Sequence, residues 1–432
     1  MTIKLINKYI LMYIMERAAL EQSNHWWIKG KVDPELALPF KRAVFAEIEK
    51  RMKERFIIAL VGLRRVGKTT LAYQLIENLI REGAPKETIL FFSFDEAAAT
   101  LGDVLESYKE AHKKDFRGGR VTVFLDELQK CRNWENELKK YYDLYPKLKF
   151  VVTGSESLFI RKKTKETLAG RIAEFMIGPF TFPEYARFHA VPQTDFGYES
   201  KMKPLFITYV ENGGFPETFT IESEKSFKEY LQALVVDKIV YRDIPKRFGI
   251  EEPEFLGTLL QLIATNPGMY LDYQSLSRQF EKDRRVVKSY ISYLQESFLI
   301  RMLGNYRRGS TTLRKRKRAY PADNALIRLY APSLRADLFG RMVETAIINS
   351  LGAKSFWKNG NEVDIIHHEA PIEIKYQESI SPQDFKPLRE FMRKFHTKKA
   401  FLITKKEEKE IRFEEGTIQM VPAWKWLLEE HT

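Results

Sequence analysis

Residues 62–69 read Gly-Leu-Arg-Arg-Val-Gly-Lys-Thr, which is the spacing of a phosphate-binding loop. An apolar run at 56–61 precedes the loop and predicts a buried strand, and residues 70–76 after it have helical periodicity. In this context the glycines let backbone N–H groups surround phosphates, and the start of the helix adds partial positive charge. The predicted nucleotide-binding residues are Gly62, Arg64, Arg65, Val66, Gly67, Lys68, Thr69 and Thr70.

A second motif, which is acidic, supplies the other half of a nucleotide-binding site. The apolar run 121–125 predicts another buried strand, which ends in Asp126-Glu127. In a nucleotide site of this kind the lysine, here Lys68, reaches the β- and γ-phosphates, and the hydroxyl of Thr69 ligates Mg²⁺. Asp126 fits the second anchor of the metal, and Glu127 fits the general base that polarises an attacking water.

A third predicted strand, 149–153, ends in Gly154-Ser155. The hydroxyl of Ser155 fits a sensor of the γ-phosphate. A serine in this position also fits the N-cap of a following helix, and the sequence leaves both roles open.

Length and composition limit the number of domains, the kind of partner and the location that we expect. A chain of 432 residues is too long for one core and predicts two to four domains. The net charge of +13 favours an acidic partner, nucleic acid first. The single cysteine, Cys131, excludes an internal disulfide and predicts a reducing, cytoplasmic location. No run of about 18 apolar residues is present, so we expect no membrane insertion.

The pattern of elements changes along the chain and predicts five parts. Strand and helix patterns alternate after residue 55, mostly helical segments follow residue 185, and a three-helix pattern starts near residue 251. The predicted parts are an N-terminal helical extension (1–55), a phosphate-loop core (56–185), a helical lid (186–250), a winged helix with a basic loop (251–318) and a C-terminal α/β domain (319–432).

The three-helix region has the order of a winged helix-turn-helix. Its predicted helices are 255–264, 271–280 and 283–298, and the third carries Arg284, Arg285 and Lys288 at its exposed start. In such folds the third helix enters a groove of DNA. The same fold also serves protein contacts or intramolecular packing.

A strongly basic segment follows at 307–318, where seven of twelve residues are basic and none is acidic. This concentration of charge predicts a loop that binds nucleic-acid phosphates. The alternative is a solvated loop near an acidic face of the same protein. The basic residues are Arg307, Arg308, Arg314, Lys315, Arg316, Lys317 and Arg318.

The C-terminal part carries a candidate metal site. A predicted helix at 339–351 holds Glu344, and a predicted strand hairpin holds Asp364, Glu373 and Lys375. Carboxylates hold Mg²⁺ or Mn²⁺, and a neighbouring lysine stabilises charge or lowers the pKa of the attacking water. These residues predict a nuclease-like fold. Acidic residues and lysine also alternate with apolar residues in any half-exposed strand, which leaves catalysis open.

Taken together, these residues resemble the AAA-type archaeal and bacterial P-loop ATPases that carry a C-terminal DUF4143 domain. The resemblance covers most of the chain. It rests on the two nucleotide-site motifs and on a fixed order of further segments: 62–70, 125–127, 153–155, 169–171, 178–185 and 213–217.

The resemblance implies an α/β fold. Its expected parts are a parallel AAA-type sheet that uses ATP and Mg²⁺, a helical lid, a winged helix and a restriction-nuclease-like end carrying Glu344, Asp364, Glu373 and Lys375. It marks Arg171 as a candidate arginine finger or sensor, with a salt bridge at the sheet edge as the alternative. Phosphate-sensing arginines can act between subunits, so a homo-oligomer is a further expectation.

Two functions follow from these expectations. The first is a DNA-processing ATPase, with Mg²⁺-dependent cleavage of DNA, including branched DNA, as one form of processing. The second is a nucleotide-switched regulatory or scaffold protein with a degenerate nuclease fold.

Overall fold

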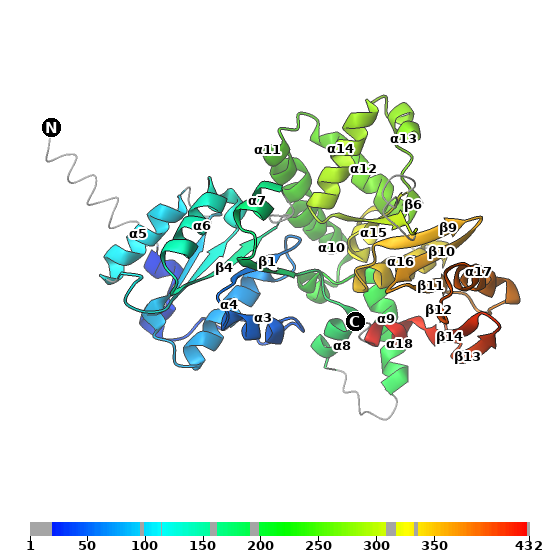
Figure 1. Ribbon diagram of the computed structural model, residues 1–432, viewed down its shortest axis with the longest axis horizontal. Coiled ribbons are helices and arrows are strands. Elements are labelled where there is room, and N and C mark those ends of the chain that lie inside the picture. The colour runs from blue at the N-terminus through cyan, green and yellow to red at the C-terminus, as the bar shows by residue number, and fades with distance from the viewer. Residues whose placement is uncertain are drawn as a thin grey trace. The chain divides into compact units, whose positions relative to one another are not determined.

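The computed structural model describes residues 20–95, 99–113, 115–155, 162–190, 198–307, 317–331 and 336–429. The chain divides into two compact units, Met1–Gly178 and Pro179–Thr432 (Figure 1). Each unit has its own sheet.

A five-stranded parallel sheet forms the core of the first unit, in the order β2-β3-β4-β1-β5. All residues of β1, β3 and β4 are buried, as expected for central strands covered by helices on both faces. Helices α3 and α4 lie on one face and α6 and α7 on the other (Figure 1). The strands are β1 (Ile57–Val61), β2 (Ile89–Ser93), β3 (Val121–Asp126), β4 (Leu148–Gly154) and β5 (Ile172–Met176), and the helices are α2 (Trp26–Lys29), α3 (Phe45–Met52), α4 (Lys68–Arg81), α5 (Leu101–His112), α6 (Trp134–Leu144) and α7 (Lys162–Thr167).

Part of the N-terminal extension covers the edge strand β2. The amide of Asn24 accepts from the backbone N–H of Phe91 at 2.6 Å and donates to its carbonyl at 2.9 Å. The indole N–H groups of Trp26 and Trp27 both donate to the carbonyl of Ile89. These contacts satisfy backbone groups that an edge strand otherwise leaves unpaired.

The second unit combines helices with a nine-stranded mixed sheet, in the order β13-β14-β12-β11-β10-β9-β7-β8-β6. Its strands are β6 (Met269–Tyr270), β7 (Ile300–Asn305), β8 (Lys317–Pro321), β9 (Ser355–Asn359), β10 (Asn361–His367), β11 (Ala370–Lys375), β12 (Lys399–Thr404), β13 (Lys409–Phe413) and β14 (Gly416–Pro422). Its α-helices are α8 (Phe182–Phe188), α9 (Tyr198–Asn212), α10 (Glu224–Tyr230), α11 (Ile244–Phe248), α12 (Pro253–Thr265), α13 (Tyr273–Gln279), α14 (Arg284–Glu296), α15 (Asn324–Tyr330), α16 (Ala336–Ser350), α17 (Lys386–Phe395) and α18 (Ala423–Leu428).

The winged helix is present in the predicted order. Helices α12, α13 and α14 are followed by the hairpin of β7 and β8, and β8 also pairs with the short strand β6. Val287, Ile291 and Leu294 form the buried stripe of α14 that its periodicity predicts. Residues 308–316 of the predicted basic loop lie outside the described residues.

The predicted boundary after residue 318 is wrong. It falls inside β8, and β7 pairs with β8 on one side and with β9 on the other. The strands of the wing and those of the C-terminal part therefore belong to one continuous sheet. The sequence could not show this, because a parallel pairing between distant strands leaves no local pattern.

The C-terminal part has the predicted order of helix, three strands, helix and strand, formed by α16, β9, β10, β11, α17 and β12. Strand β11 pairs antiparallel with β10 and parallel with β12. This arrangement brings the carboxylates of β10 and β11 next to each other.

A buried aspartate explains the Gly213-Gly214 turn in the same unit. The backbone N–H of Gly214 donates to Asp323 at 3.0 Å, and Asp323 also accepts from the N–H of Ala325 at 2.8 Å. A Cβ on Gly214 would lie 2.3 Å from the carbonyl oxygen of Phe180, so no side chain fits there.

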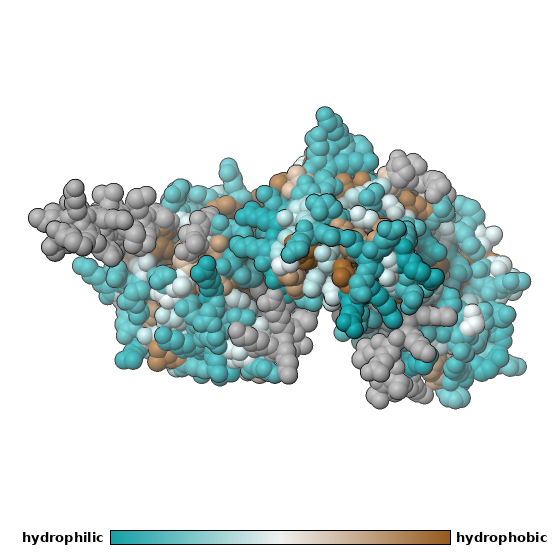
Figure 2. All heavy atoms as spheres, turned by 90° about the horizontal axis from the view of Figure 1, so that it is seen from above, coloured by the Kyte–Doolittle hydropathy of each residue, from teal (hydrophilic) through white to brown (hydrophobic). Residues whose placement is uncertain are grey.

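Hydrophilic residues dominate the face shown in Figure 2. Among the described residues, none of the helices has both the length and the apolar character needed to cross a membrane.

Candidate functional site

The phosphate loop connects the end of β1 to the start of α4. Gly62 packs so closely that a Cβ there would lie 1.9 Å from the carbonyl oxygen of Ile177. Gly67 has φ of 90° and Arg65 has φ of 64°, both in the left-handed region. The loop therefore has the tight backbone that its glycines predict.

The ammonium group of Lys68 lies inside this loop. Its Nζ donates to the carbonyl of Gly62 at 3.1 Å and to that of Leu63 at 2.6 Å. Lys68 is only 5% exposed. The charge is thus held next to the backbone that would surround the phosphates. Of the other predicted loop residues, Val66 is buried, Arg65 is exposed, and Arg64 and Thr70 are half-buried.

The structure brings Thr69 and Asp126 together from separate parts of the chain. The Thr69 hydroxyl donates to Asp126 Oδ1 at 3.1 Å, and the Thr153 hydroxyl donates to the same oxygen at 2.6 Å. Burial and the neighbouring Glu127 raise the pKa of Asp126, while the hydrogen bond from Thr153 lowers it. A hydroxyl beside a carboxylate supplies the oxygen ligands that Mg²⁺ prefers, so these residues fit the metal.

Glu127 is held by two polar side chains. Its Oε2 accepts a hydrogen bond from Ser155 Oγ at 3.2 Å, and Gln129 Nε2 also donates to it. The same Gln129 nitrogen contacts Ser155 Oγ at 2.9 Å. Ser155 therefore lies beside the predicted base. Its role as a phosphate sensor stays a prediction, and residues 156–161 after it lie outside the described part.

Sequence reasoning missed three residues of this site. Arg42 donates to the carbonyl of Val66, inside the phosphate loop, and to that of Gly178, both at 3.1 Å. Nothing local marks Arg42, since it lies in the N-terminal extension. Thr153 and Gln129 each lie within three residues of a predicted site residue, and their polar side chains were the available signal.

Arg171 does not belong to the nucleotide site of its own unit. It directly precedes β5, whose first residue, Ile172, is in register with Ile57, the first residue of β1. The phosphate loop follows the opposite end of β1. Arg171 forms an ion pair with Asp143 at 3.0 Å, which corresponds to the salt bridge considered as the alternative. A role between subunits stays a prediction.

The start of α14 presents its basic residues to solvent. Arg284, Arg285 and Lys288 are all exposed. Farther along the helix, Tyr293 stacks on Phe248 with ring centroids 4.0 Å apart. The later part of α14 is therefore engaged within the protein, whereas the first turns are accessible. Arg307, at the start of the predicted basic loop, is also exposed.

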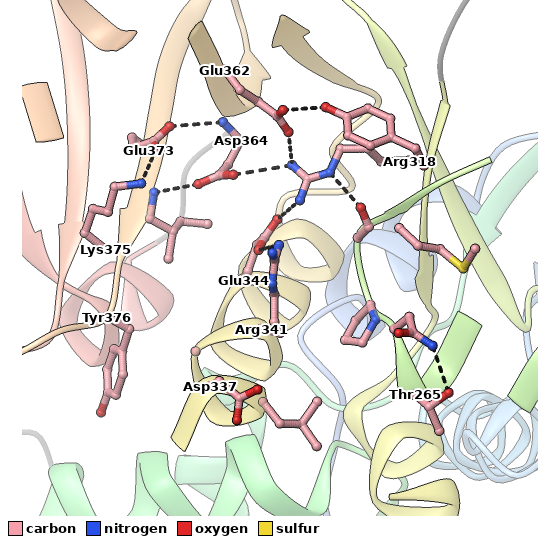
Figure 3. A pocket seen from close by; sticks show the side chains of 18 of the residues that line it. Thr265, Arg318, Asp337, Arg341, Glu344, Glu362, Asp364, Glu373, Lys375 and Tyr376 are labelled. Atoms are coloured by element: carbon pink, nitrogen blue, oxygen red, sulfur yellow. Dashed lines mark hydrogen bonds and ion pairs between the residues drawn. The ribbon is translucent and has the colours of Figure 1, made fainter. Parts of the chain in front are cut away.

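A cavity of about 1220 Å³ in the second unit contains the C-terminal candidate site (Figure 3). Glu344 comes from α16, Asp364 from β10, and Glu373 and Lys375 from β11. Lys375 Nζ donates to Glu373 Oε1 at 2.5 Å. Burial and Asp364 raise the pKa of Glu373 to about 8, against the opposing effect of Lys375. The structure thus gathers all four predicted residues in one place.

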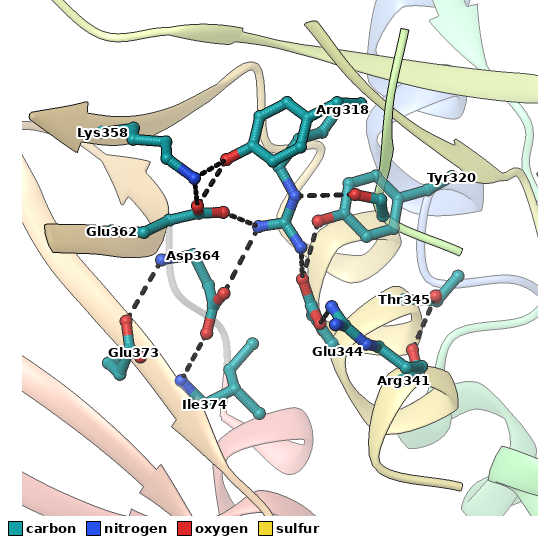
Figure 4. A network of polar contacts seen from close by, with 12 residues as sticks. Arg318, Tyr320, Arg341, Glu344, Thr345, Lys358, Glu362, Asp364, Glu373 and Ile374 are labelled. Atoms are coloured by element: carbon teal, nitrogen blue, oxygen red, sulfur yellow. Dashed lines mark hydrogen bonds and ion pairs between the residues drawn. The ribbon is translucent and has the colours of Figure 1, made fainter. Parts of the chain in front are cut away.

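The predicted DNA contact by Arg318 is wrong. Arg318 lies on β8 with its side chain 3% exposed, and its guanidinium is surrounded by carboxylates (Figure 4). It lies 2.7 Å from Glu344, 3.2 Å from Glu362 and 3.3 Å from Asp364. Arg318 therefore contacts acidic residues of the same protein, as the alternative expected, but it does so from a buried strand and not from a solvated loop.

Sequence reasoning also missed Glu362. It is two residues before Asp364 and therefore on the same face of β10, which is a signal the sequence does contain. Lys358 binds Glu362 at 2.9 Å, and the hydroxyl of Tyr270 donates to the same carboxylate. Glu362 thereby joins the carboxylates around Arg318.

Models of three protein families match the chain. An AAA domain matches residues 54–186, a domain of unknown function (DUF8612) matches 203–335, and a second domain of unknown function (DUF4143) matches 339–426. The chain therefore contains an AAA domain and a C-terminal DUF4143 domain. The resemblance stated above is therefore confirmed for these two domains, and its nuclease-like character stays an expectation. The AAA domain contains the whole nucleotide site apart from Arg42, and Arg318 lies in the DUF8612 segment.

This AAA-domain protein has similar sequences in a bacterium and an archaeon. An uncharacterized protein of Haemophilus influenzae is 23% identical over 322 residues, which are 72% of this chain and 76% of that protein. An uncharacterized protein of Methanocaldococcus jannaschii is 27% identical over 326 residues, which are 68% of this chain and 65% of that protein.

Two solved structures are also similar to it. One is the Aeropyrum pernix ORC1 protein in complex with DNA, with a TM-score of 0.34 and 13% identity over 68% of this chain and 94% of that one. The other is CDC6P from Pyrobaculum aerophilum, with a TM-score of 0.29 and 10% identity over 73% of this chain and 98% of that one.

Proposed function

We propose that this AAA-domain protein binds and hydrolyses ATP with Mg²⁺ at the phosphate loop, and that it binds DNA through its winged helix. The observation that carries the proposal is the hydrogen bond between Thr69 and Asp126, beside Lys68 and a Glu127 held by its neighbours. Four residue types with distinct roles in phosphoryl transfer are present at one edge of the sheet.

Each residue has a defined task in the proposed reaction. Lys68 would contact the β- and γ-phosphates with its ammonium group. Thr69 and Asp126 would hold Mg²⁺, which neutralises charge that develops on the phosphates. Glu127 Oε2 would accept the proton of the attacking water, and Ser155 and Gln129 would keep that carboxylate oriented.

Support for DNA binding comes from the surface of the winged helix. Arg284, Arg285 and Lys288 are exposed on the first turns of α14, the part of a recognition helix that contacts base edges. The excess of 71 Lys and Arg over 58 Asp and Glu is consistent with an acidic partner.

One observation favours the second function, a nucleotide-switched regulatory or scaffold protein. The buried Arg318 among the C-terminal carboxylates argues for a fold that no longer cleaves DNA. In that case nucleotide binding would control access to the winged helix, and hydrolysis would be slow. The homo-oligomer expected from Arg171 remains part of either proposal.

The proposals separate in an ATP hydrolysis assay on the full chain, with the Lys68→Ala variant as background control. The assay is run without DNA and with linear, single-stranded and branched DNA. Hydrolysis that DNA accelerates supports a DNA-processing ATPase. Tight ATP binding with slow hydrolysis that ignores DNA supports the regulatory protein. Absence of ATP binding by the wild type contradicts both.

A further inference from the structure

In the C-terminal site, every carboxylate oxygen of Glu344, Asp364 and Glu373 already accepts a hydrogen bond from the protein. Glu344 Oε1 accepts from Arg318 at 2.7 Å and from Tyr320 at 2.6 Å, and its Oε2 accepts from Arg341 at 3.2 Å. These bonds satisfy both oxygens of the only predicted ligand on α16.

The two carboxylates of the hairpin are satisfied in the same way. Asp364 Oδ1 accepts from Arg318 at 3.3 Å, and its Oδ2 accepts from the backbone N–H of Ile374 at 3.0 Å. Glu373 Oε1 accepts from Lys375, and its Oε2 accepts from the N–H of Asp364 at 3.3 Å. A metal ion would have to displace these donors.

The guanidinium of Arg318 is equally engaged. Its Nε donates to the carbonyl of Gly268 at 3.0 Å, its Nη2 binds Glu344, and its Nη1 lies against Glu362 and Asp364. Figure 4 shows the guanidinium between these side chains. It therefore joins the turn before β6, the wing strand β8, helix α16 and strand β10.

We infer that Arg318 takes the place of the divalent cation in the predicted C-terminal metal site, so that this domain fixes the strands of the wing and does not cleave DNA. The guanidinium compensates the charge of Glu344 and Asp364, which is the structural task of a metal. Among the described residues, no group of three or more acidic, histidine or cysteine side chains is arranged to hold a metal ion.

Charge and geometry both support this inference. A divalent cation placed among these carboxylates would meet a buried positive charge that cannot be removed by deprotonation, because arginine stays protonated in proteins. The fork of the guanidinium suits simultaneous binding to several carboxylates, whereas a lysine would supply a point charge. The bonds to β8 also hold the base of the hairpin that carries the basic loop.

The test measures how many Mn²⁺ ions the nucleotide-free full chain binds. Electron paramagnetic resonance reports the unbound ion in each titration. The proteins are the wild type, Asp364→Asn, Arg318→Met and the double variant Arg318→Met/Asp364→Asn. Arg301→Met is the matched control, because Arg301 lies on the neighbouring strand β7 and donates to the neutral amide of Asn349.

We expect the wild type, Asp364→Asn and Arg301→Met to bind the same number of Mn²⁺ ions. Arg318→Met should gain one ion, with an apparent affinity at least about tenfold above that of any wild-type site, and the double variant should lose it. A wild-type ion that Asp364→Asn removes would overturn the inference, as would a folded Arg318→Met variant without the added ion.

Loss of Arg318 leaves buried carboxylates without their partner and can prevent folding. If Arg318→Met does not fold, the number of Mn²⁺ ions bound by the wild type and by Asp364→Asn is sufficient to test the inference. This test does not involve ATP, so its result is independent of the proposed hydrolysis.

Discussion

The hydroxyl of Thr69 donates to the carboxylate of Asp126 at 3.1 Å, although the two residues are 57 positions apart. Thr69 is the second residue of the helix after β1, and Asp126 ends β3, with β4 between these strands. Thr153 of β4 donates to the same Asp126 oxygen and links the three strand ends. The proposed Mg²⁺ site is therefore organised by contacts among β1, β3 and β4 and the helix that follows β1.

Thr69→Ala should raise the Mg²⁺ concentration needed for half-maximal ATP hydrolysis by at least about tenfold, because the variant lacks an oxygen ligand for a hard cation. The measurement is the hydrolysis rate across a Mg²⁺ titration. Thr69→Ser is the control, since it keeps the hydroxyl and should behave like the wild type. An unchanged Mg²⁺ requirement in Thr69→Ala would exclude Thr69 as a ligand.

Ser155→Ala should slow ATP hydrolysis about fivefold and leave ATP affinity unchanged. It removes one hydrogen bond to Glu127 Oε2, and such a bond contributes about 1 kcal/mol. Single-turnover hydrolysis and equilibrium nucleotide binding measure the two effects separately. Ser155→Thr keeps a hydroxyl and should retain most of the rate. A loss of ATP affinity in Ser155→Ala would show that the residue binds nucleotide and does not position the base.

Replacing Arg284, Arg285 and Lys288 together by alanine should weaken DNA binding regardless of sequence. The slope of log affinity against log salt should fall by about 0.9 for each DNA phosphate that the variant no longer neutralises. Affinity measured at several salt concentrations gives both values. A slope equal to that of the wild type would show that the start of α14 does not bind phosphates.

A charge-matched control separates this effect from the change in net charge. Lys53, Lys140 and Lys225 are exposed lysines outside the winged helix, and their joint replacement removes the same charge. That variant should bind DNA like the wild type.

The basic loop is tested by replacing Arg314, Lys315, Arg316 and Lys317, with Arg318 kept because its side chain is buried.

Asp323 should make the stability of the second unit depend on pH. Burial raises the pKa of Asp323 to about 7, from an ordinary value of 3.8, against the effect of backbone N–H donors. The folded state therefore holds a proton that the unfolded state releases, so stability is largest below pH 4 and falls as pH rises to about 7. The full loss is about 4 kcal/mol, at 1.36 kcal/mol per pH unit.

The comparison with Asp323→Asn isolates this group from other titrating residues. The free energy of unfolding of the wild type minus that of Asp323→Asn should fall by about 4 kcal/mol between pH 4 and pH 7.5, because only the wild type titrates at this position. Chemical denaturation at several pH values gives the difference. A constant difference would show that Asp323 is ionised throughout this range.

The nucleotide site could be predicted because most of its residues lie in short contiguous motifs. The loop at 62–69 and the pair Asp126-Glu127 each follow a fully buried strand, and parallel strands place their ends at one edge. Arg42 could not be predicted, since it reaches the loop from a segment without any pattern of its own. The sequence could not show that Arg171 lies away from the nucleotide site of its own unit, because sequence order does not reveal at which end of the strands a residue lies.

The position of the C-terminal site was predicted correctly, but the contact of its carboxylates with Arg318 was not predicted. Asp364, Glu373 and Lys375 follow the two-residue period of strands, which places them together. Arg318 stood in a run of basic residues and was assigned to the loop, whereas β8 begins at Lys317. The contact with Glu344 depends on the pairing of β7 with β9, which joins the wing to the C-terminal strands. Long-range pairing of this kind has no local signal.

In the proposed reaction, Glu127 is the base that activates water for ATP hydrolysis. The most direct test measures ATP binding and hydrolysis by the wild type, Lys68→Ala and Glu127→Gln in one assay. We predict that Lys68→Ala abolishes hydrolysis, and that Glu127→Gln binds ATP like the wild type but hydrolyses it at least about a hundredfold more slowly, as expected on loss of a general base. Hydrolysis by Glu127→Gln at the wild-type rate would contradict the account.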